Sequence, residues 1–438
     1  MSKTILTISA IILLVMLATR IFDRDEEKSE PPRLRFVSLA WQEQAIATNK
    51  AIVKEWNAAH SNLPVEYVQG TWNSVHDYLI TSFETGDVPD VFHYESSIIV
   101  DFAMRGFLTD LSPMISADLK NDLLPVAWAS VRRANGEIPG IPFLMESFIV
   151  LYNKDLFEKS GITPPTFDRP WSWDDLRMHA RHLTRDVNGD GQFDQWGVAM
   201  GLRNSANLIM NHAISFGGSF FRSENDRYSA KVGDEEKALL KTILELLYED
   251  KSMAPASIGQ TGTAMLPGFF AGKYATLVGI GAWARQQVVE NAPAGFRWGV
   301  MPPLKAQTQN TGINTQTLSI PKKSKRPQEA MAFIEFMLST KNMALLAQSD
   351  WMLPSRKSCF EMQEFQTLED GWDVVSAGQQ FLSVGPWLGV PGYVEWKSRV
   401  ANPILQELYA RRLSLPEAAR RIEIESNLVL SRYHRGGS

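Results

Sequence analysis

The distribution of apolar and polar residues predicts alternating strands and helices in the first part of the chain. Residues 34–39 form a short apolar run of strand length, and the helix that follows carries its apolar residues on one face. The same order repeats with a strand at 63–68, an amphipathic helix at 73–84 and a third strand at 87–92. Strands that alternate with helices predict an α/β fold with a parallel sheet and right-handed crossovers.

Aromatic and acidic residues follow the carboxyl ends of these expected strands. Trp41 comes after the first strand, Trp72 after the second, and Tyr94 and Glu95 after the third. Open parallel sheets bind their ligands beyond the carboxyl ends of the strands. We therefore expect these side chains to lie at a binding site.

One stretch changes from turn to buried strand within a few residues. Residues 136–142 are rich in glycine and proline, which turn the backbone, and residues 148–152 then run without a charge. Such a run predicts a strand that is buried on both faces. A strand between two α/β units is a natural crossing between lobes, so Glu146, just before it, is expected where the lobes meet.

The same stretch carries a resemblance to a known family. Residues 141–157 contain the pattern IPF-x-x-E-S-x-x-V-L-Y-N-K-D-L-F, which resembles the first inter-lobe crossover of the extracellular solute-binding proteins of ABC importers, in their sugar-binding group (family 1). The resemblance extends over residues 34–433 and implies a two-lobed, type II periplasmic-binding-protein-like fold with three inter-lobe crossings. It also implies that Glu146 lies in a sugar cleft and that Trp283 stacks on the ligand.

The resemblance assigns the parts of the chain to two discontinuous lobes. Residues 33–145 and 303–350 are expected in the first lobe, and residues 146–302 and 351–438 in the second. Residues 1–32 are expected to be a signal peptide or an N-terminal membrane anchor, followed by a charged linker.

The N-terminal segment predicts export. An apolar run at 5–18 follows Lys3, and a charged stretch at 23–30 follows the run. Residues 17–20 give no clean small-x-small cleavage pattern, so a cleaved signal and an uncleaved anchor both stay open. The protein is expected in the periplasm or on the outer face of the cytoplasmic membrane. Cys359 is the only cysteine, which excludes an intramolecular disulfide.

Composition and motifs narrow the function. Lys and Arg number 44 against 49 Asp and Glu, for a net charge of −5, which gives no basic footprint for nucleic acid. We find no P-loop, G-x-S-x-G or H-E-x-x-H motif, so we expect a binding protein without a cofactor. The expected partners are a carbohydrate and the permease subunits of an ABC importer, and the expected state is a monomer. A membrane-anchored solute sensor remains an alternative because an uncleaved anchor stays open. A carbohydrate-active enzyme is the other alternative, because Glu95 and Glu146 could form a catalytic carboxylate pair.

Aromatic residues suit a sugar cleft, because tryptophan offers a rigid flat surface to the apolar face of a sugar ring. The chain has 13 Trp and 10 Tyr, so most of them must serve packing. The candidate ligand-binding residues are Trp41, Trp72, Tyr94, Glu95, Glu146, Trp283, Trp351, Trp387, Tyr393 and Trp396.

One polar loop resembles a calcium site. Oxygen-bearing side chains alternate along it at Asp186, Asn188, Asp190, Gln192 and Asp194. The position where the bidentate glutamate of a calcium loop belongs is Gly197. A surface hairpin without metal is therefore the expected structure, with calcium as the alternative.

Overall fold

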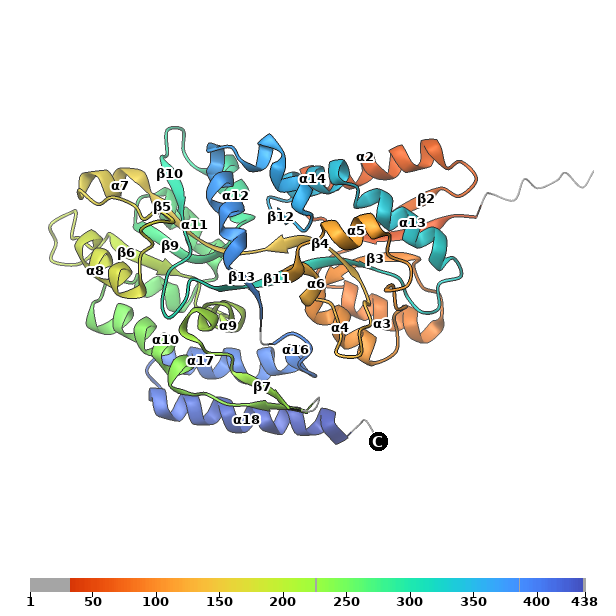
Figure 1. Ribbon diagram of the computed structural model, residues 1–438. Helices are drawn as coiled ribbons and strands as arrows, with labels where there is room; N and C mark the ends of the chain where they lie inside the picture. The colour runs from red at the N-terminus through yellow and green to blue at the C-terminus, as the bar shows by residue number, and fades with distance from the viewer. Residues whose placement is uncertain (1–31, 225–226, 386, 436–438) are drawn as a thin grey trace, which may run out of the picture.

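The computed structural model describes residues 32–224, 227–385 and 387–435. Their strands form two main sheets, one in each of two lobes that lie side by side in Figure 1. The expected signal or anchor at 1–32 lies outside the described residues, except for its last residue. Within the described part, no single helix is long and apolar enough to cross a membrane; α13 (Pro327–Met337) and α14 (Thr340–Ser349) qualify only as a pair, bent by 69°.

The first lobe is built on a sheet with the strand order β12-β4-β11-β3-β1-β2. Its strands β1 (Leu34–Ser38), β2 (Val65–Gln69) and β3 (Val91–Glu95) are parallel, as the sequence predicts. β11 (Thr311–Ser319) lies between β3 and β4 (Ile141–Glu146) and runs antiparallel to both. The late segment β11 thus completes a sheet that the N-terminal strands begin.

Helices cover both faces of this sheet because its strands are apolar on both sides. On β1, Phe36 faces the core formed with α2 (Glu43–Ala59), α13 and α14, whereas Val37 faces the core formed with α3 (Val75–Thr85) and α4 (Ser96–Met104). Successive side chains of a strand point to opposite faces, so one strand feeds two cores.

The second lobe contains a four-stranded sheet in the order β10-β5-β9-β6. β6 (Trp196–Met200) and β9 (Tyr274–Gly281) are parallel, and β5 (Phe148–Asn153) and β10 (Trp298–Met301) complete the sheet in antiparallel fashion. β5 is the strand expected from the uncharged run, and all of its residues except the first are buried.

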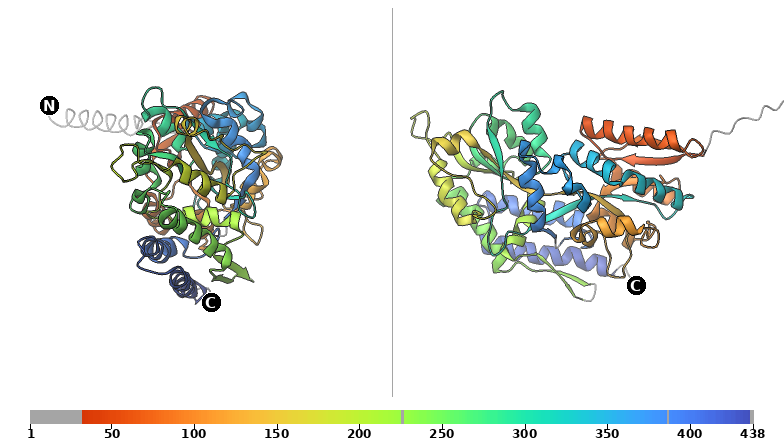
Figure 2. Two further views of the ribbon diagram at one scale, coloured as in Figure 1. Left: turned by 90° about the vertical axis from the view of Figure 1, so that its left-hand side faces the viewer. Right: turned by 45° about the horizontal axis from the view of Figure 1, so that its top comes forward.

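Helices also cover both faces of the second sheet. Apart from short 3-10 and π-helical segments, the remaining elements of the described residues are α5 (Ala117–Asp122), α6 (Pro125–Ala129), α7 (Lys154–Lys159), α8 (Trp173–Leu183), α9 (Ala206–Ala213), β7 (Phe221–Glu224), β8 (Arg227–Ala230), α10 (Asp234–Leu244), α11 (Gly262–Phe270), α12 (Ala284–Asn291), β12 (Leu353–Pro354), α15 (Trp372–Ala377), β13 (Leu382–Val384), α16 (Tyr393–Trp396), α17 (Asn402–Tyr409) and α18 (Leu415–Arg435). The C-terminal helices α17 and α18 form an outer layer on the second lobe, which both views of Figure 2 show at the lower side.

The chain passes between the lobes at short connections. Ser147 alone separates β4 of the first sheet from β5 of the second. The segment between β10 and β11 returns to the first lobe, and β13 later pairs in parallel with Thr311–Ile313 of β11. Two strands therefore run side by side where the lobes meet.

The last crossing of the chain from the first lobe to the second lies later in the sequence than the expected boundary at 351. β12 pairs with β4 of the first sheet, and both Cys359 and Phe365 pack in the core of the first lobe. The second lobe resumes only around α15, whose Trp372 packs in the first-lobe core while Val375 packs with the second lobe.

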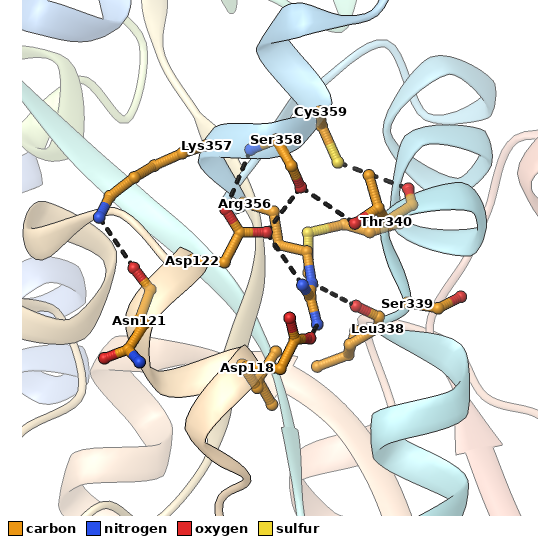
Figure 3. Close-up of polar contacts among 12 residues, drawn as sticks. Asp118, Asn121, Asp122, Leu338, Ser339, Thr340, Arg356, Lys357, Ser358 and Cys359 are labelled. Atoms are coloured by element: carbon orange, nitrogen blue, oxygen red, sulfur yellow. Dashed lines mark hydrogen bonds and ion pairs between the residues drawn. The ribbon is translucent and has the colours of Figure 1, made fainter.

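A buried arginine holds this segment on the first lobe (Figure 3). Arg356 donates to the carbonyl of Leu338 at 2.6 Å and to the carboxylates of Asp118 and Asp122 at 2.8 and 2.9 Å. Asp122 also accepts from the backbone N–H and the hydroxyl of Ser358. A charge-assisted network of this kind fixes residues 356–358 against α5 and the end of α13.

Candidate functional site

The first wall of the site comes from the carboxyl ends of three neighbouring strands. Trp41 follows β1, Trp72 follows β2 and Glu95 is the last residue of β3. Because these strands are parallel and adjacent, their carboxyl ends share one edge of the sheet. The side chain of Trp41 is half exposed there, at 50%.

The second wall meets the first through a tryptophan and a glutamate. Trp283, which follows β9, donates its indole N–H to Oε1 of Glu146 at the end of β4, over 3.0 Å. The rings of Trp283 and Trp41 stand edge to face with their centroids 5.8 Å apart. Residues from both lobes therefore converge at this point.

Gly281 makes room for the bond between Trp283 and Glu146. A Cβ at position 281 would lie 2.2 Å from Nε1 of Trp283 and 2.9 Å from Oε1 of Glu146. At Gly281 the structure uses the missing side chain to let these two binding candidates approach each other.

A neutral histidine lies behind this region. The backbone N–H of Leu39 donates to Nδ1 of His93, so Nε2 carries the proton and donates to Oε1 of Gln316 at 2.8 Å. Burial lowers the pKa of His93 to about 4, despite the opposing effect of the Gln316 bond. Because the side-chain oxygen of Gln316 is occupied by His93, its side-chain N–H groups can donate to a ligand.

Two carboxyl groups in the site are held away from their ordinary pKa values. Burial raises the pKa of Glu146, with a further rise from Glu95, against the lowering effect of the Trp283 and Asn314 hydrogen bonds. Burial and the charge of Glu146 raise the pKa of Asp350 to about 7. Asp350 is only 6% exposed, and its Oδ1 atom has no hydrogen-bond partner among the described residues.

These side chains enclose a cavity of about 290 Å³ between the lobes, which we call the inner cavity. Its lining residues are Trp41, Trp72, Glu95, Glu146, Trp283, Gln316, Asp350 and Met352. A second cavity of about 240 Å³ shares Glu146 and Trp283 with it and continues along the second lobe, past Arg203, Asn207 and Thr263. The two cavities are therefore adjacent, on either side of Glu146 and Trp283.

A third and larger cavity, of about 720 Å³, lies between α4 of the first lobe and α16 and α18 of the second. Charged groups line it: Glu395 pairs with Arg399 at 3.3 Å and with Arg432 at 2.9 Å. Tyr393 also lines it and donates its hydroxyl to Asn207 at 2.7 Å, which connects this cavity to the second one.

The structure separates the candidate residues into lining and packing positions. Six line one of the three cavities: Trp41, Trp72, Glu95, Glu146, Trp283 and Tyr393. Their contact with a ligand stays a prediction. The other four, Tyr94, Trp351, Trp387 and Trp396, line none of these cavities.

Each of those four residues has a packing role. Tyr94 packs in the core beside α3 and α4, and Trp387 lies in the core of the second lobe, 2% exposed. Trp396 is also 2% exposed and donates to the hydroxyl of Ser426 at 2.6 Å. Trp351 stacks on Trp372 with 5.8 Å between centroids, next to the cavity rather than in its lining.

Sequence reasoning missed Asp350, Gln316 and Met352 of the inner cavity. Gln316 lies within a strand that is buried along its whole length although most of its residues are polar, and this polar stretch, TGINTQTLS, is a signal that could have marked it. Asp350 and Met352 flank Trp351, and that neighbouring tryptophan is the only sign in the sequence that this turn approaches the cleft.

The polar loop at 186–194 forms a closed hairpin. The Asp186 carboxylate accepts from the backbone N–H groups of Gly189, Asp190 and Gly191, and that of Asp194 accepts from Val187 and Asn188. Within the described ranges, no group of three or more His, Cys, Asp or Glu residues is placed to hold a metal ion. Calcium binding by this loop stays untested.

The comparisons place the chain among known proteins. The profile of the bacterial extracellular solute-binding protein family matches residues 40–344. An uncharacterised lipoprotein from the oleD 5′ region of Streptomyces antibioticus is 37% identical over 418 residues, which cover 95% of this chain and 90% of that protein. The diacetylchitobiose-binding protein DasA of Streptomyces coelicolor is 22% identical over 68% of each chain.

Solved structures share the fold. The substrate-binding protein Lmo0181 of Listeria monocytogenes, in complex with cycloalternan, superposes with a TM-score of 0.76 and 22% identity, covering 91% of this chain and 99% of that one. The two-lobed architecture expected from the sequence is therefore confirmed.

Proposed function

Because the chain belongs to the bacterial extracellular solute-binding proteins, we propose that it captures a sugar or oligosaccharide in the cleft between its lobes and delivers it to the permease of an ABC importer. The observation that carries this proposal is the inner cavity, where tryptophans and carboxyl groups from both lobes converge. The relatives of this chain named for diacetylchitobiose and found with cycloalternan support a carbohydrate as the solute.

The chemistry of the cleft suits a saccharide. Trp41, Trp72 and Trp283 offer flat apolar surfaces for sugar rings, and indole side chains lose little conformational freedom when they bind. Glu95 and Glu146 can each accept hydrogen bonds from sugar hydroxyls. The second cavity adds Arg203, Asn207 and Thr263.

Delivery would follow from closure of the lobes. The inner cavity takes residues from both lobes, so a bound ligand favours the arrangement in which both walls touch it. A permease that reads the closed arrangement would then accept only the loaded protein. We place the protein outside the cytoplasmic membrane, in the periplasm or anchored to the outer face, as a monomer without enzymatic activity or nucleic-acid partner.

Titration of the purified full-length protein with saccharides tests the proposal. Isothermal titration and thermal unfolding should be measured with maltotriose, diacetylchitobiose, arabinotriose and cycloalternan, and with free amino acids for comparison. A saccharide at about 100 times its dissociation constant should add about 2.7 kcal/mol to the free energy of unfolding. The ligand should remain intact after prolonged incubation, whereas a carbohydrate-active enzyme would cleave it.

Two tryptophan variants locate the binding. Trp283→Ala should abolish most of the saccharide affinity because it removes the tryptophan of the second wall from the inner cavity. Trp298→Ala, on β10 and outside the lining of all three cavities, is the matched control and should retain affinity. Stabilisation by amino acids alone, or equal losses in the two variants, would contradict the proposed cleft.

A further inference from the structure

The inner cavity carries an uncompensated acidic charge. Three carboxyl groups line it, those of Glu95, Glu146 and Asp350, and no lysine, arginine or histidine is among its lining residues. The nearby guanidinium of Arg285 does not neutralise them. It donates to the backbone carbonyls of Ala282, Asp370 and Trp351.

Asp350 shows most clearly that a partner is missing. More than nine-tenths of the residue is buried, it lines the cavity, and its Oδ1 atom has no hydrogen-bond partner among the described residues. Its backbone carbonyl is held by the side-chain amide of Gln42 at 3.3 Å, which fixes the turn that carries the carboxyl group. A buried polar atom without a partner costs free energy unless a ligand satisfies it.

The aromatic lining points to the sign of the ligand's charge. Trp41 and Trp283 meet edge to face across the cavity, and Trp72 completes the aromatic part of the lining. The faces of indole rings attract cations, and carboxylates beside them add charge-assisted hydrogen bonds. A neutral sugar could donate its hydroxyl protons to these carboxylates but would leave their charge in the cavity uncompensated.

We propose that the inner cavity binds a sugar ring that carries a protonated amino group, so that the solute is a cationic amino saccharide. This inference rests on the proposed function and narrows it to one class of saccharide. The ammonium group lies among the three carboxyl groups, and the ring lies against the tryptophans. The second cavity adjoins the inner one, so further rings of a longer saccharide extend into it.

The ionisation of Asp350 gives a second way to detect a cationic ligand. Asp350 lines the cavity together with Glu146, Glu95 and Gln316, while Gln42 and Arg285 donate to the backbone carbonyls of Asp350 and Trp351. Burial and the Glu146 charge raise the pKa of Asp350 to about 7, so the group is mostly protonated at pH 6 without ligand. An ammonium group displaces that proton, whereas a hydroxyl group does not require its release.

The test compares saccharides that differ only in an amino group. The full-length protein is titrated calorimetrically at pH 6 with glucosamine, galactosamine and the β-1,4 trimer of glucosamine. Glucose, galactose and cellotriose serve as their hydroxyl counterparts. We expect each amino form that binds to bind at least about tenfold more tightly than its counterpart, a factor typical of charge-assisted bonds. Titrations in two buffers of different ionisation enthalpy should show release of a proton with the amino form only.

Variants assign the effect to the cavity. Asp350→Asn should abolish the proton release, and both Asp350→Asn and Glu146→Gln should reduce the advantage of the amino form about tenfold. Glu55→Gln removes one negative charge from an exposed ion pair on α2 with Lys341, and should change nothing.

The outcomes distinguish this inference from the function on which it rests. If hydroxyl saccharides bind as tightly as their amino forms, the inference is overturned and the saccharide-binding function stands. An amino-form advantage that survives both cavity variants would also overturn it. If no saccharide of either kind binds, the proposed function fails together with the inference.

Discussion

Replacement of Asp350 by asparagine should stabilise the ligand-free protein at pH 8 and have little effect at pH 4. The carboxyl group is buried beside Glu146 and lacks a partner for Oδ1 among the described residues. Asparagine has nearly the same shape and carries no charge. The substitution therefore removes the cost of a buried carboxylate while the cavity keeps its size.

The magnitude follows from the pKa of Asp350. Folding raises this pKa from 3.8 to about 7, so the folded state holds the proton more tightly than the unfolded state. The stabilising contribution of the protonated group is complete below pH 3.8 and is lost as the pH rises through 7. The difference between the two pKa values corresponds to a loss of about 4 kcal/mol above pH 7. Because the effective dielectric constant at buried sites in proteins is higher than that of a dry interior, we expect Asp350→Asn to recover only about 1 to 3 kcal/mol at pH 8.

Urea unfolding of the full-length protein at several pH values measures this effect. The free energies of unfolding of wild type and Asp350→Asn should coincide near pH 4 and separate between pH 4 and 8. Asp122→Asn provides a control of opposite sign. Although burial opposes it, the hydrogen bonds from Ser358 and Arg356 lower the pKa of Asp122, so its loss should destabilise the protein near pH 7. A separation for Asp350→Asn that does not change with pH would refute the electrostatic explanation.

Three further substitutions test the site and its supports. Arg285→Met should lower the free energy of unfolding, measured in urea, by about 2 to 4 kcal/mol. Three backbone carbonyls lose their donor, and the ring of Trp372, 4.1 Å from the guanidinium, loses its cation. A loss below about 1 kcal/mol would contradict this explanation. Gly281→Ala should displace Trp283 and weaken saccharide binding at least about tenfold by calorimetry, whereas Gly259→Ala, with no atom within 4 Å of the added Cβ, should not. Trp396→Phe should cost about 1 to 3 kcal/mol of stability through the lost core contacts and Ser426 bond, and unchanged saccharide affinity would agree with its packing role.

The sequence predicts the first wall of the site because two general rules coincide there. Periodicity identifies β1, β2 and β3, and the strand-end rule then places Trp41, Trp72 and Glu95 at one edge of the sheet. Neither rule depends on distant parts of the chain. Glu146 is expected where the lobes meet because it directly precedes the crossing strand, whereas its place in a sugar cleft and the role of Trp283 come from the family resemblance, since neither rule relates two residues that lie so far apart in the sequence.

The missed residues depend on contacts that no local pattern encodes. Gln316 enters the site because β11 inserts between β3 and β4, with Gln316 opposite Glu95 and Asn314 opposite Glu146. That register is a property of the folded sheet. The raised pKa of Asp350 likewise comes from burial against Glu146, a residue more than 200 positions away in the sequence.

Buried aromatic residues show the opposite limit of sequence reasoning. Trp387 lies in an irregular, apolar stretch and Trp396 at the end of the short helix α16, and both settings are typical of a cleft wall as well as of a core. Their environment is decided by the C-terminal helices, since Trp396 donates to Ser426 of α18. The boundary at 351 has a similar cause, because the bonds of Arg356 to Asp118 and Asp122 keep the following residues on the first lobe.

Arg285 connects the binding site to the segment that passes between the lobes. It lies two residues after Trp283 in α12, and it donates to the carbonyl of Trp351, the residue after Asp350, and to that of Asp370. Both acceptor residues have a positive φ, 55° and 52°, a conformation that non-glycine residues keep only where the surroundings hold it. A change in the position of Trp283 or Asp350 on ligand binding therefore reaches the same guanidinium. A ligand shifts the lobes toward closure only if it binds the closed state more tightly than the open state. We expect the contacts of Arg285 to differ between these two states, because they join the binding site to the segment that passes between the lobes.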